Sequence, residues 1–218
     1  MNTSTNMGLP VLRPGEVEDG AEIERRASGV ALLAVGASFL IVSMLAASMA
    51  PGYDFHGGAI SDLGVIAATA LLFNILLVAI GTLNAVAGYL SYRSHRNIWL
   101  LAMYLLAGVG AVGAGFFPLD TGGAHTIFAL LAFVFFNLEA LGTAAVTRGL
   151  LRLLSAAAGA VGLVYVVVMV IGDGGNPSIF GAIGHGGSER MIAYPAMIWT
   201  LVFGGYLIAQ PEPRPPMR

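Results

Sequence analysis

Six long stretches without a charged residue are the feature that most constrains this chain. A helix needs about 20 mainly apolar residues to cross roughly 30 Å of hydrocarbon. The charge-free stretches are residues 27–53, 63–92, 97–119, 121–138, 153–172 and 191–211. They leave little of the 218 residues for anything else. We therefore expect an all-α, polytopic membrane protein, folded as a bundle of six transmembrane helices.

The overall composition agrees with a membrane protein. Apolar residues make up 57% of the chain and charged residues 10%, against about 45–50% and about 25% in soluble domains. The mean hydropathy is +0.82. The chain has no cysteine, which excludes disulfides and thiolate metal sites. Its net charge of −2 predicts no nucleic-acid partner.

The predicted organisation is one transmembrane domain, residues 27–210, between two polar ends. Residues 1–26 are expected to form a cytoplasmic arm, either solvated or a short amphipathic helix, because residues 16–24 are rich in glutamate. Residues 211–218 are expected to form a cytoplasmic tail, since its prolines cannot continue a helix. The expected spans are residues 28–50, 63–91, 98–117, 125–147, 151–172 and 190–209.

The arginines predict the orientation of the bundle. All ten basic residues are arginine, and nine of them flank the spans on one side, while Arg190 alone lies on the other. Loops rich in basic residues stay in the cytoplasm. We therefore predict a cell-membrane protein with both termini cytoplasmic and residues 50–62, 118–125 and 173–189 outside.

Small residues recur at helical spacing in the third and fifth spans. In lipid, close backbone approach through such residues replaces the hydrophobic drive between helices. We expect helix contacts at Gly108, Ala111, Gly115, Ser155, Gly159 and Gly162.

Polar residues collect where the second, fourth and sixth spans begin, opposite the arginine-rich side. They are Ser61, Asp62, Asp120, His125, His185, Ser188, Glu189 and Arg190. Ser61, Asp62 and Ser188 stand where a side chain could cap a helix N-terminus, and capping alone would explain both serines. Ionisable groups near lipid usually face a cavity or a partner. We therefore expect a shared polar pocket at this face.

The candidate catalytic residues, which are also the candidate metal ligands, are Asp62, His125, His185 and Glu189. His185 and Glu189 share a helix face if the sixth helix begins early enough. The four groups could hold a divalent metal such as Zn, act as an acid–base pair without metal, or form a structural network. Ser61 and Arg190 are candidate ligand-binding residues, with Arg190 as a phosphate contact.

Glu139 is the one carboxylate expected inside the membrane. It lies fourteen residues after His125, about 21 Å deeper along the fourth span at about 1.5 Å per residue. We expect it to be neutral or bonded to Asn74, Asn84 or an arginine. A transport role is the alternative.

Several short motifs occur in an order typical of a known membrane family. They are Ile60-Ser61-Asp62-Leu63-Gly64, Phe73-Asn74, Gly115-Phe-Phe-Pro118, His125, Glu189-Arg190, Tyr194-Pro195 and Trp199. Over about residues 29–207 the chain resembles the prokaryotic integral membrane family called domain of unknown function 998 (DUF998). It is more distantly similar to the Frag/DRAM/Sfk group, which includes a Golgi protein associated with lipid remodelling of GPI anchors. The resemblance implies six helices and singles out Ser61, Asp62 and His125, but it implies no particular reaction and does not extend to His185.

The predicted function is to bind or process a lipid head group, or another membrane-associated molecule, in an outward-facing Asp/His/Glu pocket. Processing would make the protein a membrane-embedded, lipid-modifying hydrolase. One alternative is a transporter of small solutes or ions, with Glu139 and buried asparagines along its path. Another is a non-catalytic scaffold or sensor. Membrane lipids are the expected partners.

Overall fold

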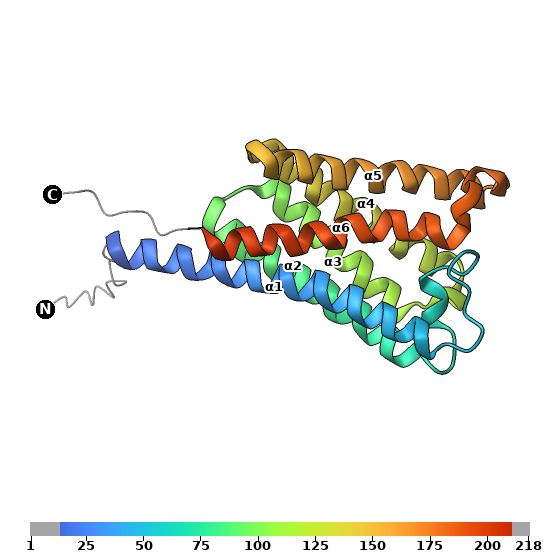
Figure 1. Ribbon diagram of the computed structural model, residues 1–218. Helices are drawn as coiled ribbons and strands as arrows, with labels where there is room; N and C mark the ends of the chain where they lie inside the picture. The colour runs from blue at the N-terminus through green and yellow to red at the C-terminus, as the bar shows by residue number, and fades with distance from the viewer. Residues whose placement is uncertain (1–13, 211–218) are drawn as a thin grey trace, which may run out of the picture.

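The computed structural model describes residues 14–210, with side chains from Gly20 onward, as a bundle of long helices (Figure 1). The helices are α1 (Pro14–Met49), α2 (Ala70–His95), α3 (Ile98–Phe116), α4 (Gly123–Val146), α5 (Gly149–Asp173) and α6 (Gly184–Ala209). Three short 3-10 helices lie in the connections: η1 (Ser61–Gly64), η2 (Leu119–Thr121) and η3 (Pro177–Ile183). All six long helices can cross a membrane by length and composition. The predicted fold is confirmed.

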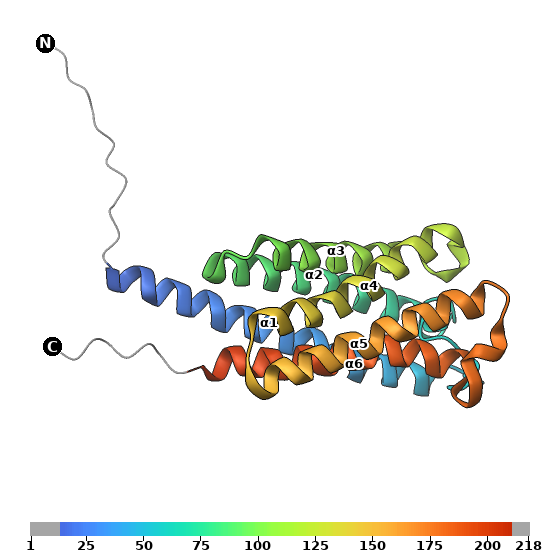
Figure 2. The ribbon, with the colours of Figure 1, turned by 90° about the horizontal axis from the view of Figure 1, so that it is seen from above.

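The six helices form a closed ring. Each packs against the next along the chain, α1 packs against α6, and α4 also touches α6. Figures 1 and 2 show that α1 begins and α6 ends at the same end of the bundle. The predicted tail and residues 1–13 of the predicted arm lie outside the described residues, while residues 14–26 belong to α1.

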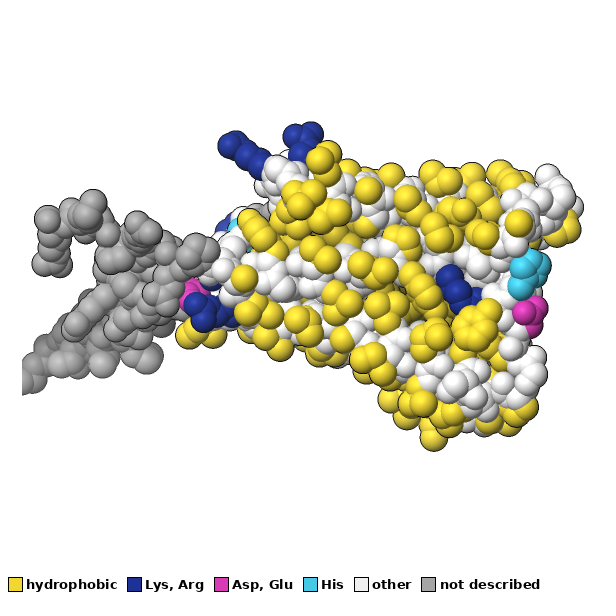
Figure 3. All heavy atoms as spheres, viewed as in Figure 1, with side chains coloured by type: hydrophobic (Ala, Val, Ile, Leu, Met, Phe, Trp, Pro, Cys, Tyr) yellow, Lys and Arg dark blue, Asp and Glu magenta, His cyan; other side chains and the backbone are white. Residues whose placement is uncertain are grey.

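The two ends of the bundle differ in charge. We call one the arginine-rich end, because it carries Arg25, Arg26, Arg93, Arg96, Arg148 and Arg152. The opposite end, formed by η1, η2, η3 and the loops around them, is called the cleft end. Figure 3 shows apolar side chains over the middle of the bundle, with histidine and acidic side chains at the right-hand, cleft end.

Small residues bring the helices close together, as predicted. A Cβ atom on Gly108 would lie 2.6 Å from the carbonyl oxygen of Gly81, and one on Gly159 would lie 2.5 Å from that of Asn137. Gly115 and Gly162 are equally close to α2 and α4, and Ala111 and Ser155 are buried. The predicted helix contacts in α3 and α5 are confirmed.

Apart from α1, two helices begin more than two residues away from the expected start. The second was predicted to start at residue 63, but α2 starts at Ala70. Residues 61–69 turn instead, because the Thr69 hydroxyl donates to the Leu63 carbonyl at 2.8 Å and Asn74 Nδ2 donates to the Gly64 carbonyl at 2.9 Å. α6 starts at Gly184, earlier than the predicted residue 190. Gly184 itself has a φ of +68°, which glycine adopts without strain.

Buried polar side chains tie neighbouring helices together. The Ser28 hydroxyl of α1 donates to the Ala87 carbonyl of α2 at 2.9 Å, and Trp199 Nε1 of α6 donates to the Ser155 hydroxyl of α5 at 2.9 Å. Arg25 donates to the carbonyls of Leu207 and Gln210, near the end of α6. Basic side chains satisfy the last carbonyls of a helix in this way. These bonds lie away from the cleft end and stabilise the bundle that carries it.

Candidate functional site

A cleft of about 660 Å³ lies at the cleft end, between the loop before η1 and helices α4, α5 and α6. Five of the six predicted site residues line it: Ser61, Asp62, His125, His185 and Glu189. The apolar part of its wall includes Leu130 and Phe133 of α4 and Met169 and Val170 of α5. Arg190 is the one of the six that does not line the cleft.

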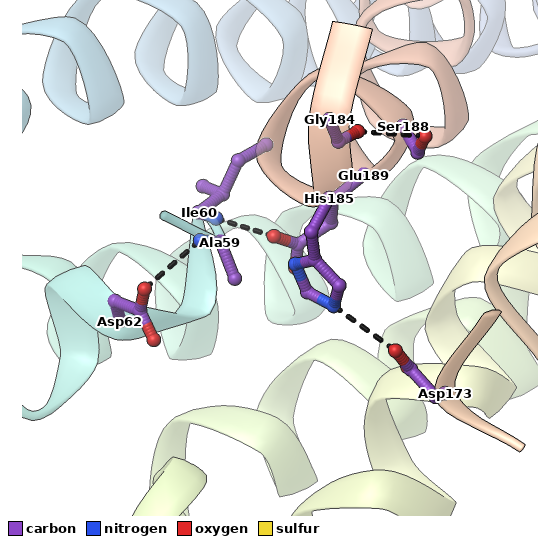
Figure 4. Close-up of polar contacts among 8 residues, drawn as sticks. All are labelled: Ala59, Ile60, Asp62, Asp173, Gly184, His185, Ser188 and Glu189. Atoms are coloured by element: carbon purple, nitrogen blue, oxygen red, sulfur yellow. Dashed lines mark hydrogen bonds and ion pairs between the residues drawn. The ribbon is translucent and has the colours of Figure 1, made fainter. Parts of the chain in front are cut away.

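Asp62 and Ser61 enter the cleft from η1. Asp62 Oδ2 accepts a hydrogen bond from the Ala59 amide at 2.9 Å, which holds the loop before η1 (Figure 4). Both side chains are half-buried. They do not cap α2, whose N-cap is Thr69, so that part of the capping hypothesis is wrong. The helix begins too late for Ser61 or Asp62 to reach its free amides.

Glu189 projects from α6 toward the same loop. Its carboxylate accepts a hydrogen bond from the Ile60 amide, and the side chain is only 4% exposed (Figure 4). Ser188 beside it donates to the Gly184 carbonyl at 2.9 Å within α6. Ser188 therefore lies inside the helix and is not its cap, contrary to the prediction.

His185 lies one turn before Glu189 on the same face of α6, because the helix begins at Gly184 as the shared face requires. Its Nε2 atom is 3.1 Å from Asp173 Oδ1, at the end of α5 (Figure 4). The ring also meets Phe180 of η3 edge-on, with centroids 5.1 Å apart. Sequence reasoning missed Asp173, although it is the first charged residue after the fifth apolar stretch.

His125 lies in the first turn of α4 and is 5% exposed. Its Nδ1 atom is 2.8 Å from the Phe117 carbonyl oxygen. A carbonyl oxygen only accepts hydrogen bonds, so Nδ1 carries the hydrogen. In the neutral ring Nε2 then holds a lone pair and can accept a proton. The connection through η2 thus sets both the position and the tautomer of this histidine.

A small apolar cavity of about 60 Å³ lies deeper in the bundle, next to the cleft. Ser61, His125, Glu189, Ala129 and Phe133 line both spaces. Beyond them the wall is almost entirely apolar, with residues such as Phe73, Phe136 and Met197. Ser61, His125 and Glu189 therefore lie at the boundary between the cleft and an apolar interior.

The four candidate metal ligands have separate partners: a loop amide for Asp62, another for Glu189, Asp173 for His185 and the Phe117 carbonyl for His125. Among the side chains of residues 20–210, no three of His, Asp or Glu come together as a metal site requires. The zinc hypothesis stays a prediction.

Arg190 points away from the cleft and holds the loop of residues 51–60. It donates to the Gly186 carbonyl at 2.7 Å, the Phe55 carbonyl at 3.0 Å and the Tyr53 hydroxyl at 2.6 Å. Its guanidinium carbon also lies 4.7 Å from the centroid of the Phe55 ring. These partners differ from the predicted phosphate, and they give Arg190 a structural role.

Two loop groups have shifted pKa values. Burial raises the pKa of Tyr53, against the opposing charge of Arg190, so its hydroxyl stays neutral and can donate to the Ala59 carbonyl at 2.7 Å. The amides of His56 and Gly57 donate to Asp54 and lower the pKa of its carboxyl group. Both shifts belong to a loop that is ordered by its own hydrogen bonds.

The fold and the cleft together define a six-span membrane protein with a polar site at one end of its bundle. The chain belongs to the family described as protein of unknown function (DUF998), which it matches over residues 33–206, well over half of its length. No curated protein and no solved structure matches the chain. The resemblance to this family is confirmed, while the more distant likeness to the Frag/DRAM/Sfk group stays a prediction.

Proposed function

We propose that the protein binds a membrane lipid, with the polar head group held in the cleft by Asp62, His125, His185 and Glu189. The observation that carries this proposal is the composition of the cleft wall. Leu130 of α4 and Val170 of α5 line the cleft and are 41% and 56% exposed. Such side chains face lipid in a membrane-spanning bundle. A lipid could therefore enter between α4 and α5 without leaving the bilayer.

The charges in the cleft favour a head group that donates hydrogen bonds. Asp62, Asp173 and Glu189 line it, and none of its described lining residues is lysine or arginine. Carboxylates accept hydrogen bonds and repel anions. A head group with hydroxyl or amine groups fits this wall better than the phosphate that the sequence suggested.

His125 is the group best placed for chemistry on such a lipid. With its hydrogen on Nδ1, Nε2 can take a proton from water or from a hydroxyl group of the ligand, which is the role of a general base. Hydrolysis of the bound lipid is therefore the reaction class that this site would support. Lipid content and product formation, measured separately, distinguish binding from hydrolysis.

The test is the lipid content of the purified protein, measured by mass spectrometry for wild type, Asp62→Asn, Glu189→Gln and Asp120→Asn. Asp120 is exposed at the same end but does not line the cleft, so it is the matched control. We expect wild type and Asp120→Asn to enrich one lipid class, and the two cleft variants to lose that enrichment. The same lipids in all four proteins would overturn the proposal.

A second measurement tests whether the protein hydrolyses the bound lipid. The enriched class is incubated with wild type and His125→Ala in liposomes, and the products are analysed. A product formed by wild type alone would make the protein a hydrolase. Retained lipid without any product would leave a lipid-binding protein.

Solute transport is the second candidate function. Its support is a separate group of buried polar side chains around Glu139, which lies further from the cleft end, toward the arginine-rich end of the bundle. That group is the basis of the inference below.

A further inference from the structure

A second polar cluster is buried toward the arginine-rich end of the bundle. Glu139 of α4 has no exposed surface, and its Oε1 atom accepts a hydrogen bond from Asn84 Nδ2 of α2 at 2.6 Å. Asn84 Nδ2 also donates to the Tyr104 carbonyl of α3 at 3.2 Å. The predicted bond between Glu139 and Asn84 is present. The cluster therefore joins three helices inside the membrane.

This cluster holds most of the unpaired buried polar atoms of the described residues. Buried side-chain atoms nearly always have a hydrogen-bond partner. Among residues 20–210, the buried polar atoms without one include Asn84 Oδ1, Tyr104 OH, Glu139 Oε2 and Thr143 Oγ1. Thr143 follows Glu139 by one helical turn. Four oxygens of one cluster therefore have no hydrogen-bond partner within the described part of the protein.

A cavity of about 500 Å³ reaches this cluster from the arginine-rich end. Tyr104 and Thr143, both 1% exposed, line it together with polar residues nearer the end of the bundle. Those polar residues are Ser91, Tyr92, His95, Asn97, Thr147, Arg148 and Gln210. Tyr104 and Thr143 thus line the cavity and also neighbour the Glu139–Asn84 pair, Tyr104 through its carbonyl and Thr143 one turn along α4.

The chemistry of the pair indicates which ligand is bound. An ionised carboxylate is costly to bury without a cation, and no described arginine or histidine forms an ion pair with Glu139. A proton on Oε2 turns that oxygen from an acceptor into a donor. Asn84 Oδ1 is an unpaired acceptor on the residue that already contacts Glu139. One proton can therefore provide partners for both atoms.

We propose that Glu139 is a reversible proton-binding site, loaded from the cavity at the arginine-rich end through the hydroxyl groups of Tyr104 and Thr143. The proton comes from water in the cavity and returns to it, and no other bond changes. Tyr104 is the titratable group that faces Glu139. The other titratable or charged groups along the cavity are Tyr92, His95, Arg148 and Tyr206. Protonation would remove the one negative charge from this part of the bundle.

The test is infrared difference spectroscopy of the full-length protein in lipid nanodiscs. We expect wild type to show a carboxylic-acid C=O band at neutral pH that shifts in D₂O and decreases reversibly as the pH is raised. The band should be lost in Glu139→Gln, whose amide can make the same two hydrogen bonds, and kept in Glu189→Gln. Tyr104→Phe should keep the band but slow its shift after the change to D₂O.

Three results would overturn the proposal. The first is a wild-type spectrum without a band that depends on Glu139. The second is a band that neither exchanges with D₂O nor responds to pH, which would make Glu139 a purely structural group. The third is a band that sodium ions abolish at constant pH, which would assign the unpaired oxygens to a metal cation. None of these results bears on lipid binding at Asp62 and Glu189, which the lipid analysis tests separately.

Discussion

At the scale of single residues, the polar groups of the cleft end serve two different purposes. Arg190 and Tyr53 form hydrogen bonds that hold the loop of residues 51–60. Asp62 and Glu189 each accept one loop amide but also line the cleft. His125 is held by a single carbonyl and keeps one ring nitrogen for other chemistry. Removing a group of the first kind should loosen the loop, which in turn carries the amides that position Asp62 and Glu189.

Replacing Arg190 by glutamine should release this loop. The change removes charged hydrogen bonds to three loop residues, Tyr53, Phe55 and Gly58, and a bond of that kind contributes about 1.5–3 kcal/mol. We expect a lower free energy of unfolding, by about 2 kcal/mol, and faster cleavage of the loop by an added protease. The free energy of unfolding and the rate of cleavage are both measured on purified protein in detergent.

The control for this change is Arg152→Gln, which alters an exposed arginine of α5 at the opposite end. It should leave thermal stability and loop cleavage at wild-type values. Equal cleavage of both variants would mean that Arg190 does not hold the loop.

At the scale of helices, sequence reasoning predicted the spans well and their connections poorly. Apolar runs without charge determine where the chain can cross lipid, so six spans could be predicted. The start of α2 could not, because Thr69 and Asn74 bind carbonyls of the preceding turn and delay the helix. The contact between His185 and Asp173 was also missed, because it depends on how a connection folds. The two side chains meet only because η3 brings the end of α5 back to the start of α6. The bonds of Arg190 to the loop of residues 51–60 were not predicted, because such partners leave no signal in the sequence.

The contact between α1 and α6 offers a precise test of helix packing. A Cβ atom on Gly204 would lie 2.6 Å from the carbonyl oxygen of Gly29, whereas one on Gly205 would meet nothing within 4 Å. Gly204→Ala should therefore lower the free energy of unfolding by about 1–3 kcal/mol, as overpacking does.

Gly205→Ala is the matched control, since it makes the same chemical change one residue further along α6. It should leave stability unchanged or raise it by up to about 1 kcal/mol, because alanine favours a helix more than glycine. Thermal unfolding followed by circular dichroism measures both variants. Similar midpoints for the two would show that α1 and α6 are not in tight contact at Gly29.

At the scale of the whole molecule, the two ends of the bundle carry different kinds of site. The cleft end combines carboxylates and histidines with a wall that faces lipid, and the arginine-rich end opens a polar cavity toward Glu139. The two proposed sites lie toward different ends of the bundle and share no lining residue, so neither needs the other in order to bind its ligand. The arginines predict which side of the membrane each site faces, since an arginine-rich end is expected to stay in the cytoplasm.

The orientation can be tested with single cysteines, because the chain contains none of its own. Ser178 is exposed at the cleft end and His95 at the arginine-rich end. In intact cells, a maleimide that cannot cross the membrane should label Ser178→Cys and leave His95→Cys unlabelled. After permeabilisation it should label both, which shows that each thiol is reachable. The opposite pattern would place the arginines outside, and the cleft would then take its lipid from the inner leaflet.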